Sequence, residues 1–85
     1  MNFVIIAFRS RSHTLRFAEV LRNKGVPAEV INTPREAYVG CGLSVRIPKN
    51  YLSGIRRGSI SREYPSYAGI FQPVYVGGKL TLKSI

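Results

Sequence analysis

The side chain with the most reactive chemistry in this sequence is Cys41, its one cysteine, which stands between Gly40 and Gly42. Reactive thiols occupy partly exposed, electropositive surroundings that favour the thiolate, whereas cysteines used for packing lie among apolar neighbours. Flanking glycines leave the sulfur and the nearby backbone N–H groups open to an anion. Such a thiolate can accept a terminal sulfur or selenium atom and pass it on without a base or a metal. The alternative is that Cys41 is an inert small residue in a turn.

The residues before Cys41 predict a short helical turn. Thr33 and Glu36 have the spacing of a capping box, and Pro34 stands at the first helical position, where its missing N–H costs nothing. Gly40 is the preferred type of residue for a left-handed C-terminal cap. Cys41 is therefore expected on a connection rather than inside a helix or strand.

Hydropathy period and turn residues predict the elements that position this connection. They are a strand over 2–8, a helix over 13–24 capped by Ser12 and ended by Gly25, a strand over 28–32, a strand over 43–47 stopped by Pro48, a weak helix over 50–58, and a hairpin over 67–82. Because both faces of the first strand are apolar, it should lie centrally in its sheet. Proline is tolerated at the start of a strand or in an edge strand, so Pro27 indicates that the second strand begins near it or lies at a sheet edge.

The last third of the chain is predicted to be a loop followed by a hairpin. Residues 59–66 are polar and contain a proline, which is typical of a loop. Gly77 and Gly78 between two β-prone runs indicate the hairpin turn. Pro73 interrupts the first arm, so pairing there is expected to be split or bulged.

This order of elements fits an α/β fold of the α+β sandwich type, a ferredoxin-like βαββαβ domain over residues 1–85 with an extra C-terminal strand or hairpin. In that topology the end of the first strand, the start of the first helix and the end of the second strand meet at one sheet edge. Cys41 precedes the third strand, which starts at the same edge. The residues expected at the thiol site are Arg9, Arg11, Ser12, His13, Arg35, Gly40, Gly42 and Arg46. Among these, Arg9, Arg11 and Arg35 would stabilise an anionic cargo.

The charge of the chain indicates an anionic partner. Thirteen Lys and Arg stand against four Glu and no Asp, for a formal net charge of +9. One interpretation is a nucleic-acid-binding module using aromatic and basic residues that lie close in sequence: Tyr51, Arg56, Arg57, Arg62, Tyr64 and Tyr67. Another is a basic adaptor that docks an acidic protein through Arg35 and Arg46. The strands lack the aromatic–basic alternation of a nucleic-acid stacking platform.

The remaining chemistry favours a carrier over an enzyme. His13 could act as a general base for Cys41 in a hydrolase or a peroxidase-like site, but the chain has no Asp to orient it. One cysteine and one histidine make no zinc set, so we expect no metal and no cofactor other than sulfur or selenium carried on Cys41. The sequence shows neither a signal peptide nor an apolar run long enough for a membrane span, so we expect a cytoplasmic protein.

Several segments together resemble a known family. They are the strand ending in Phe8, the Ser12-led helix, residues 31–36 and residues 41–46, with a looser match at 69–71. Over about residues 2–48 the chain resembles the putative Se/S carrier protein-like family of small bacterial domains. The resemblance implies a thiol carrier of selenium or sulfur, with Cys41 matching the family's motif cysteine and with donor and acceptor proteins as partners.

The resemblance weakens after residue 48. There the family implies a longer and more regular second helix, and residues 79–85 extend past its common core. If so small a chain leaves one face of the first strand uncovered, a homodimer would cover it.

Overall fold

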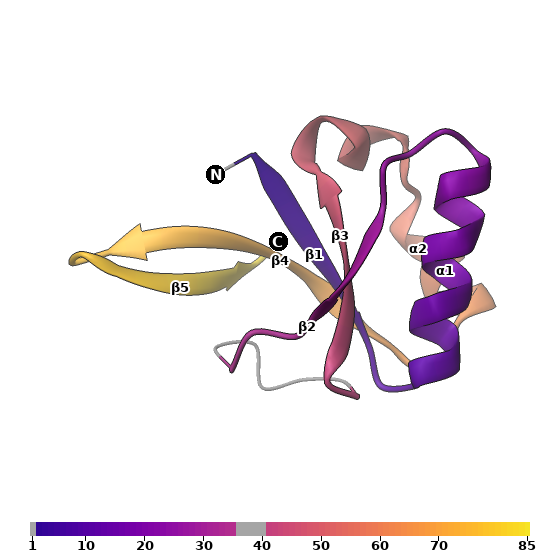
Figure 1. Ribbon diagram of the computed structural model, residues 1–85, viewed down its shortest axis with the longest axis horizontal. Coiled ribbons are helices and arrows are strands. Elements are labelled where there is room, and N and C mark those ends of the chain that lie inside the picture. The colour runs from indigo at the N-terminus through magenta and orange to yellow at the C-terminus, as the bar shows by residue number, and fades with distance from the viewer. Residues whose placement is uncertain (1, 36–40) are drawn as a thin grey trace.

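The fold is that of a computed structural model, which describes residues 2–35 and 41–85. The elements in order are β1 (Phe3–Phe8), α1 (Arg11–Asn23), β2 (Glu29–Asn32), β3 (Leu43–Pro48), the 3-10 helix η2 (Lys49–Gly54), α2 (Arg57–Glu63), β4 (Tyr67–Val76) and β5 (Lys79–Ser84). The strands form one antiparallel sheet in the order β2-β3-β1-β4-β5. Figure 1 shows α1 and α2 on one side of this sheet and the β4–β5 hairpin extending away from them. The ferredoxin-like α+β plan with an extra C-terminal strand is confirmed.

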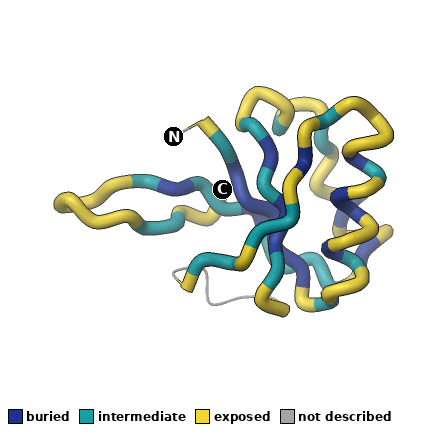
Figure 2. Tube along the Cα trace, in the orientation of Figure 1, coloured by how far each residue is buried: buried dark blue, intermediate teal, exposed yellow. Residues whose placement is uncertain are grey.

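The central strand of the sheet is β1, as its apolar residues predict. It pairs with β3 on one side and with β4 on the other. All five residues from Val4 to Phe8 are at most 2% exposed, and β1 is the longest dark blue stretch in Figure 2. Val4, Ile6 and Phe8 face the helices and join the main core cluster. The shorter β2 lies at the sheet edge, where Pro27 allows it.

Helix α1 begins earlier than the sequence suggests, and Ser12 as its cap is wrong. The cap is Ser10, whose hydroxyl accepts the backbone N–H of His13 at 3.3 Å. The Ser12 hydroxyl lies inside the first turn, 3.0 Å from that of Ser10. Both serines suit a cap by residue type, and β1 ends at Phe8 as predicted, so the connection before the helix is two residues shorter than expected.

The C-terminal end of α1 confirms the role of Gly25. Its φ of 85° lies in the left-handed region that glycine adopts without strain. The N–H of Gly25 donates to Arg22 at 3.0 Å and that of Val26 to Leu21 at 2.9 Å. These two bonds form a Schellman motif, which satisfies the last carbonyl groups of the helix.

The helix predicted over 50–58 and the loop predicted over 59–66 are both wrong in their bounds. Residues 49–54 form η2, and α2 occupies Arg57–Glu63. This segment is polar apart from two side chains, Ile60 and Tyr64, and both are buried in the main core. Burying these side chains favours the helix more than the local sequence opposes it.

The expected break at Pro73 is absent from the hairpin. Pro73 pairs with Leu82 inside a continuous ladder, and the irregular register lies elsewhere, between Ala7 and Phe8. Because Ile85 donates its N–H to the Ile70 carbonyl, the even-numbered residues of β4 turn their backbone groups toward β5. The nitrogen of Pro73 therefore points away from β5, and no ladder bond is lost.

The turn of this hairpin is as predicted. Gly77 and Gly78 have φ angles of 59° and 80°, the two positive values that a type I′ turn requires. The second arm, β5, runs two residues beyond the predicted end at Leu82.

Candidate functional site

The thiol of Cys41 is exposed at the end of the sheet where the central strand β1 terminates. The backbone N–H of Cys41 donates to the carbonyl of Phe8, the last residue of β1, at 3.1 Å. Its Sγ lies 3.7 Å from Thr14 Oγ1 and 3.7 Å from the Leu43 carbonyl oxygen. Figure 1 shows the end of β1, the start of α1 and the start of β3 at this same end of the sheet. The sulfur therefore stands beside the first turn of α1, whose dipole favours a negative charge.

Two bonds of Thr33 close the segment that carries the thiol. Its N–H donates to the Gly42 carbonyl at 2.8 Å, and its hydroxyl meets that of Ser44 at 2.6 Å. Ser44 is fully buried and Thr33 is half-buried, so the pair joins a buried hydroxyl to a partly exposed one. Gly42 has a φ of 93°, a backbone shape that favours glycine, directly after Cys41. The predicted capping role of Glu36 and the cap at Gly40 lie outside the described residues.

Thr14 is the neighbour of the thiol that the sequence did not single out. It is fully buried in the first turn of α1, and its hydroxyl donates to the Ser10 carbonyl at 3.0 Å. The same hydroxyl oxygen can accept the S–H of Cys41, and after rotation the hydroxyl can donate to a thiolate. The sequence signal that could have indicated Thr14 is its position on the same helical face as the apolar residues of α1.

The three arginines predicted to stabilise an anionic cargo are close in sequence to the strand and helix ends that meet near Cys41. Arg9 and Arg11 flank the helix cap, Arg35 follows β2, and all three are exposed. Within residues 2–35 and 41–85 their guanidinium groups form no hydrogen bond or ion pair. In that same part of the chain the sulfur of Cys41 touches Thr14 and Leu43, so a role for these arginines toward the thiol stays a prediction.

His13 and Arg46 are engaged elsewhere. The Nδ1 of His13 lies 2.6 Å from the Ser66 hydroxyl, and its ring packs edge-on to Tyr64 with 5.6 Å between centroids. Arg46 forms an ion pair with Glu29, and its guanidinium lies 5.2 Å from the centre of a phenylalanine ring in β1. These contacts favour neither residue as a partner of the thiol.

The tyrosines proposed for nucleic-acid stacking are in part core residues. Tyr64 is 5% exposed and packs on Phe8 with ring centres 5.5 Å apart, while Tyr67 packs on Phe8 at 6.1 Å. Burial raises the pKa of both tyrosines, and the charge of Glu63 adds to the effect on Tyr64 while Arg16 opposes it. The buried Tyr64 ring is not available to stack on a base, whereas Tyr67 is half-buried and Tyr51 is exposed. The nucleic-acid and adaptor interpretations stay predictions.

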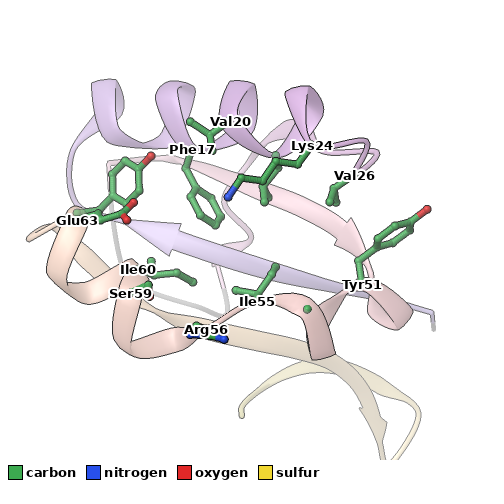
Figure 3. A pocket seen from close by; sticks show the side chains of 13 residues that line it. Phe17, Val20, Lys24, Val26, Tyr51, Ile55, Arg56, Ser59, Ile60 and Glu63 are labelled. Atoms are coloured by element: carbon green, nitrogen blue, oxygen red, sulfur yellow. The ribbon is translucent and has the colours of Figure 1, made fainter.

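A separate cavity of about 470 Å³ lies between α1, η2 and α2. Figure 3 shows its apolar walls, with Phe17, Ile55 and Ile60 among them, and charged groups of Lys24 and Arg56 beside them. None of the described contacts of Cys41 belongs to this cavity.

The described part of the chain contains no group of three or more His, Cys, Asp or Glu that could bind a metal ion. None of its helices is long and apolar enough to cross a membrane.

Comparison with protein families gives one match. A family model described as "Putative Se/S carrier protein-like" matches residues 3–70. No curated protein and no solved structure matches the chain. The matched range extends past residue 48, where the sequence resemblance weakened, and includes η2, α2 and the start of β4.

Proposed function

Because the chain belongs to the family described as "Putative Se/S carrier protein-like", we propose that it carries sulfur or selenium on the sulfur of Cys41. The observation that carries this proposal is the exposed position of Cys41, the one thiol of the chain. A thiol that must meet two protein partners in turn has to be accessible from solvent. The family name supports a cargo of sulfur or selenium and partners that supply and receive it.

The proposed transfer needs no external oxidant or reductant, because the outer sulfur atom moves from one thiolate to another. The Cys41 thiolate attacks the outer sulfur of a donor persulfide, the donor's sulfur–sulfur bond breaks, and the donor leaves as a thiolate. Cys41 then holds a persulfide anion, which an acceptor nucleophile attacks in the second step to regenerate the Cys41 thiolate. A donor with an S–Se bond delivers selenium in the same way and leaves a selenosulfide on Cys41.

Two groups of residues would serve this exchange. The Thr14 hydroxyl, 3.7 Å from the sulfur, would accept from the thiol and donate to the thiolate. Arg9, Arg11 and Arg35 would neutralise the anionic cargo from the surrounding edge, because long guanidinium side chains on exposed turns can reach a charge there. Acidic surfaces on donor and acceptor would be drawn to the same edge.

Intact-mass spectrometry after incubation with a persulfide donor tests the proposal. Wild type should gain the mass of one sulfur, reductant should remove it, and Cys41→Ser should gain nothing. A matched control moves the thiol: the double variant Cys41→Ser, Ser53→Cys places one cysteine at an exposed site in η2. Uptake by that variant at the wild-type rate, or no uptake by wild type, contradicts a carrier site at Cys41.

A further inference from the structure

The sheet has a free edge at β5, the second arm of the C-terminal hairpin. This strand comes last in the order β2-β3-β1-β4-β5, and Figure 1 shows the hairpin extending away from the helices. The family match ends at residue 70, so all of β5 and most of β4 lie outside it. The proposed carrier chemistry therefore uses no part of this hairpin.

Every second residue of β5 points its backbone groups away from the sheet. The N–H of Ile85 donates to the Ile70 carbonyl at 2.9 Å, and this pair continues the β4–β5 register. Since bonded and non-bonded pairs alternate in an antiparallel ladder, the odd-numbered residues of β5 bond to β4. The N–H and C=O groups of Leu80 and Leu82 therefore point to the free edge. No other strand or loop among the described residues bonds to them.

The hairpin also exposes apolar side chains beside this edge. Tyr75, Val76 and Leu80 are 65%, 63% and 39% exposed, and they are three of the five large apolar side chains that are exposed in residues 2–35 and 41–85. Such side chains, when clustered, mark interaction sites. Tyr75 pairs directly with Leu80, so both side chains lie on one face of the hairpin. A strand added beside β5 would extend this row with an apolar side chain of its own.

The other face of β5 carries two cations that lack a carboxylate partner in the described chain. Lys79 and Lys83 alternate with the leucines, and their direct partners in β4 are Val76 and Gln72. Residues 67–85 contain no Asp or Glu, and neither lysine forms an ion pair with a described residue. Opposite charges on neighbouring strands attract, so an acidic side chain across from each lysine would stabilise an added strand.

The geometry points to β5 as a docking edge for an extended segment of an acidic protein. The segment would lie beside β5, hydrogen-bond to Leu80 and Leu82, and alternate acidic residues with apolar ones. A second copy of the chain does not suit this edge, because in a continuous sheet its lysines would join Lys79 and Lys83 on the same face. The lysines thus discourage pairing between copies and favour a strand of opposite charge.

Amide hydrogen exchange of the isotope-labelled chain tests this docking edge. The probe is a synthetic peptide of sequence Glu-Val-Glu-Val-Glu-Val. When it occupies about nine-tenths of the chains, exchange of the Leu80 and Leu82 amides should slow about tenfold, because only the free tenth exchanges. The Tyr75 amide points to the opposite edge of the same hairpin, so its exchange should change by less than about twofold.

Two control peptides separate strand pairing from charge. One has proline in place of each valine, which keeps the carboxylates but prevents a backbone ladder. The other has lysine in place of each glutamate, which keeps the ladder but reverses the charge. Both should bind at least about tenfold more weakly than the glutamate–valine peptide.

Two matched pairs of variants test the same two contributions on the protein. Lys83→Glu should weaken binding of the glutamate–valine peptide about tenfold. Lys24→Glu makes the same change of charge at the end of α1, away from the hairpin in Figure 1, and should stay within about threefold. Leu80→Pro removes an outward N–H and should weaken binding about tenfold, whereas Tyr75→Pro removes one on the opposite edge and should not. Circular dichroism should show all four variants folded.

Several results would overturn the proposal. They are no binding of the glutamate–valine peptide, equal binding of the proline peptide, and protection of the Tyr75 amide in place of that of Leu80. Binding of a homopolymeric RNA that Lys83→Glu abolishes would also overturn it, because the lysines would then serve phosphates. A wild-type dimer in reductant that Leu80→Pro disperses would show instead that β5 pairs with a second copy. None of these measurements depends on Cys41, so the outcome is independent of the carrier proposal.

Discussion

The pair of hydroxyls that closes the Cys41 segment allows a quantitative prediction. Thr33 Oγ1 and Ser44 Oγ lie 2.6 Å apart, and Ser44 is fully buried while Thr33 is half-buried. Thr33→Val keeps the shape of the side chain and removes the partner of the Ser44 hydroxyl. Ser44→Ala instead leaves the Thr33 hydroxyl, which water can reach. The two single changes should therefore differ in cost.

The expected magnitudes follow from burial. An unsatisfied buried hydroxyl costs about 1–3 kcal/mol, so Thr33→Val should lower the free energy of unfolding by about 2 kcal/mol. Ser44→Ala loses only the net value of one hydrogen bond, about 1 kcal/mol. The double variant should cost about 1 kcal/mol, about 2 kcal/mol less than the sum of the two, because one hydrogen bond is lost once and no buried hydroxyl is left alone. In a domain of this size, 2 kcal/mol lowers Tm by about 8–16 °C.

Urea unfolding of the four proteins in this double-mutant cycle measures the coupling. Thr81→Val is the control, because its hydroxyl donates to the Val74 carbonyl at 3.3 Å in the outlying hairpin and leaves no buried hydroxyl behind. We expect it to cost under about 1 kcal/mol. The reasoning fails if Thr33→Val costs no more than Thr81→Val, or if Thr33→Val and Ser44→Ala are additive.

Three further predictions follow from the helix ends and from Tyr64. Ser10→Ala should lower the free energy of unfolding by about 1 kcal/mol and Ser12→Ala by little, since only Ser10 caps α1; equal losses in urea unfolding would contradict this. Gly25→Ala should cost about 1 kcal/mol through its φ of 85°, whereas Gly54→Ala, without a positive φ, should not. Burial raises the pKa of Tyr64 above its ordinary 10.0, so its stabilising effect is complete below that pH and is lost as pH rises through the folded value. Tyr64→Phe should therefore reduce the loss of stability above pH 10, measured by urea midpoints.

The first half of the fold could be predicted because its signals are local. The run of apolar residues in β1 and the glycine after α1 each determine structure within a few residues. These signals were enough to place Cys41 beside the first turn of α1. The contact with Thr14 could not be predicted, because it depends on how the helix is rotated against the sheet. The ambiguity between Ser10 and Ser12 as the cap is two residues, a little more than half a helical turn, and it changes which helical residue is expected to face the thiol.

The second half could not be predicted because tertiary contacts determine it. Helix α2 has a polar sequence with glycine and serine, and it forms where Ile60 and Tyr64 reach the core. Pro73 is acceptable within a ladder only because of the direction in which its nitrogen points, and the pairing register fixes that direction. Neither register nor burial can be read from the composition of a segment.

The central place of β1 also affects how the protein must be made. This strand is synthesised before both of its neighbours in the sheet, and its partner in β4 is more than 55 residues later in the chain. Ribosomes add about 5–20 residues per second, so for several seconds an apolar six-residue β-prone segment has no complete sheet to join. Such segments are prone to aggregate, and charged residues directly after them act as gatekeepers. Arg9 and Arg11 stand in that position, which gives these arginines a use during synthesis whether or not they meet a cargo in the folded protein.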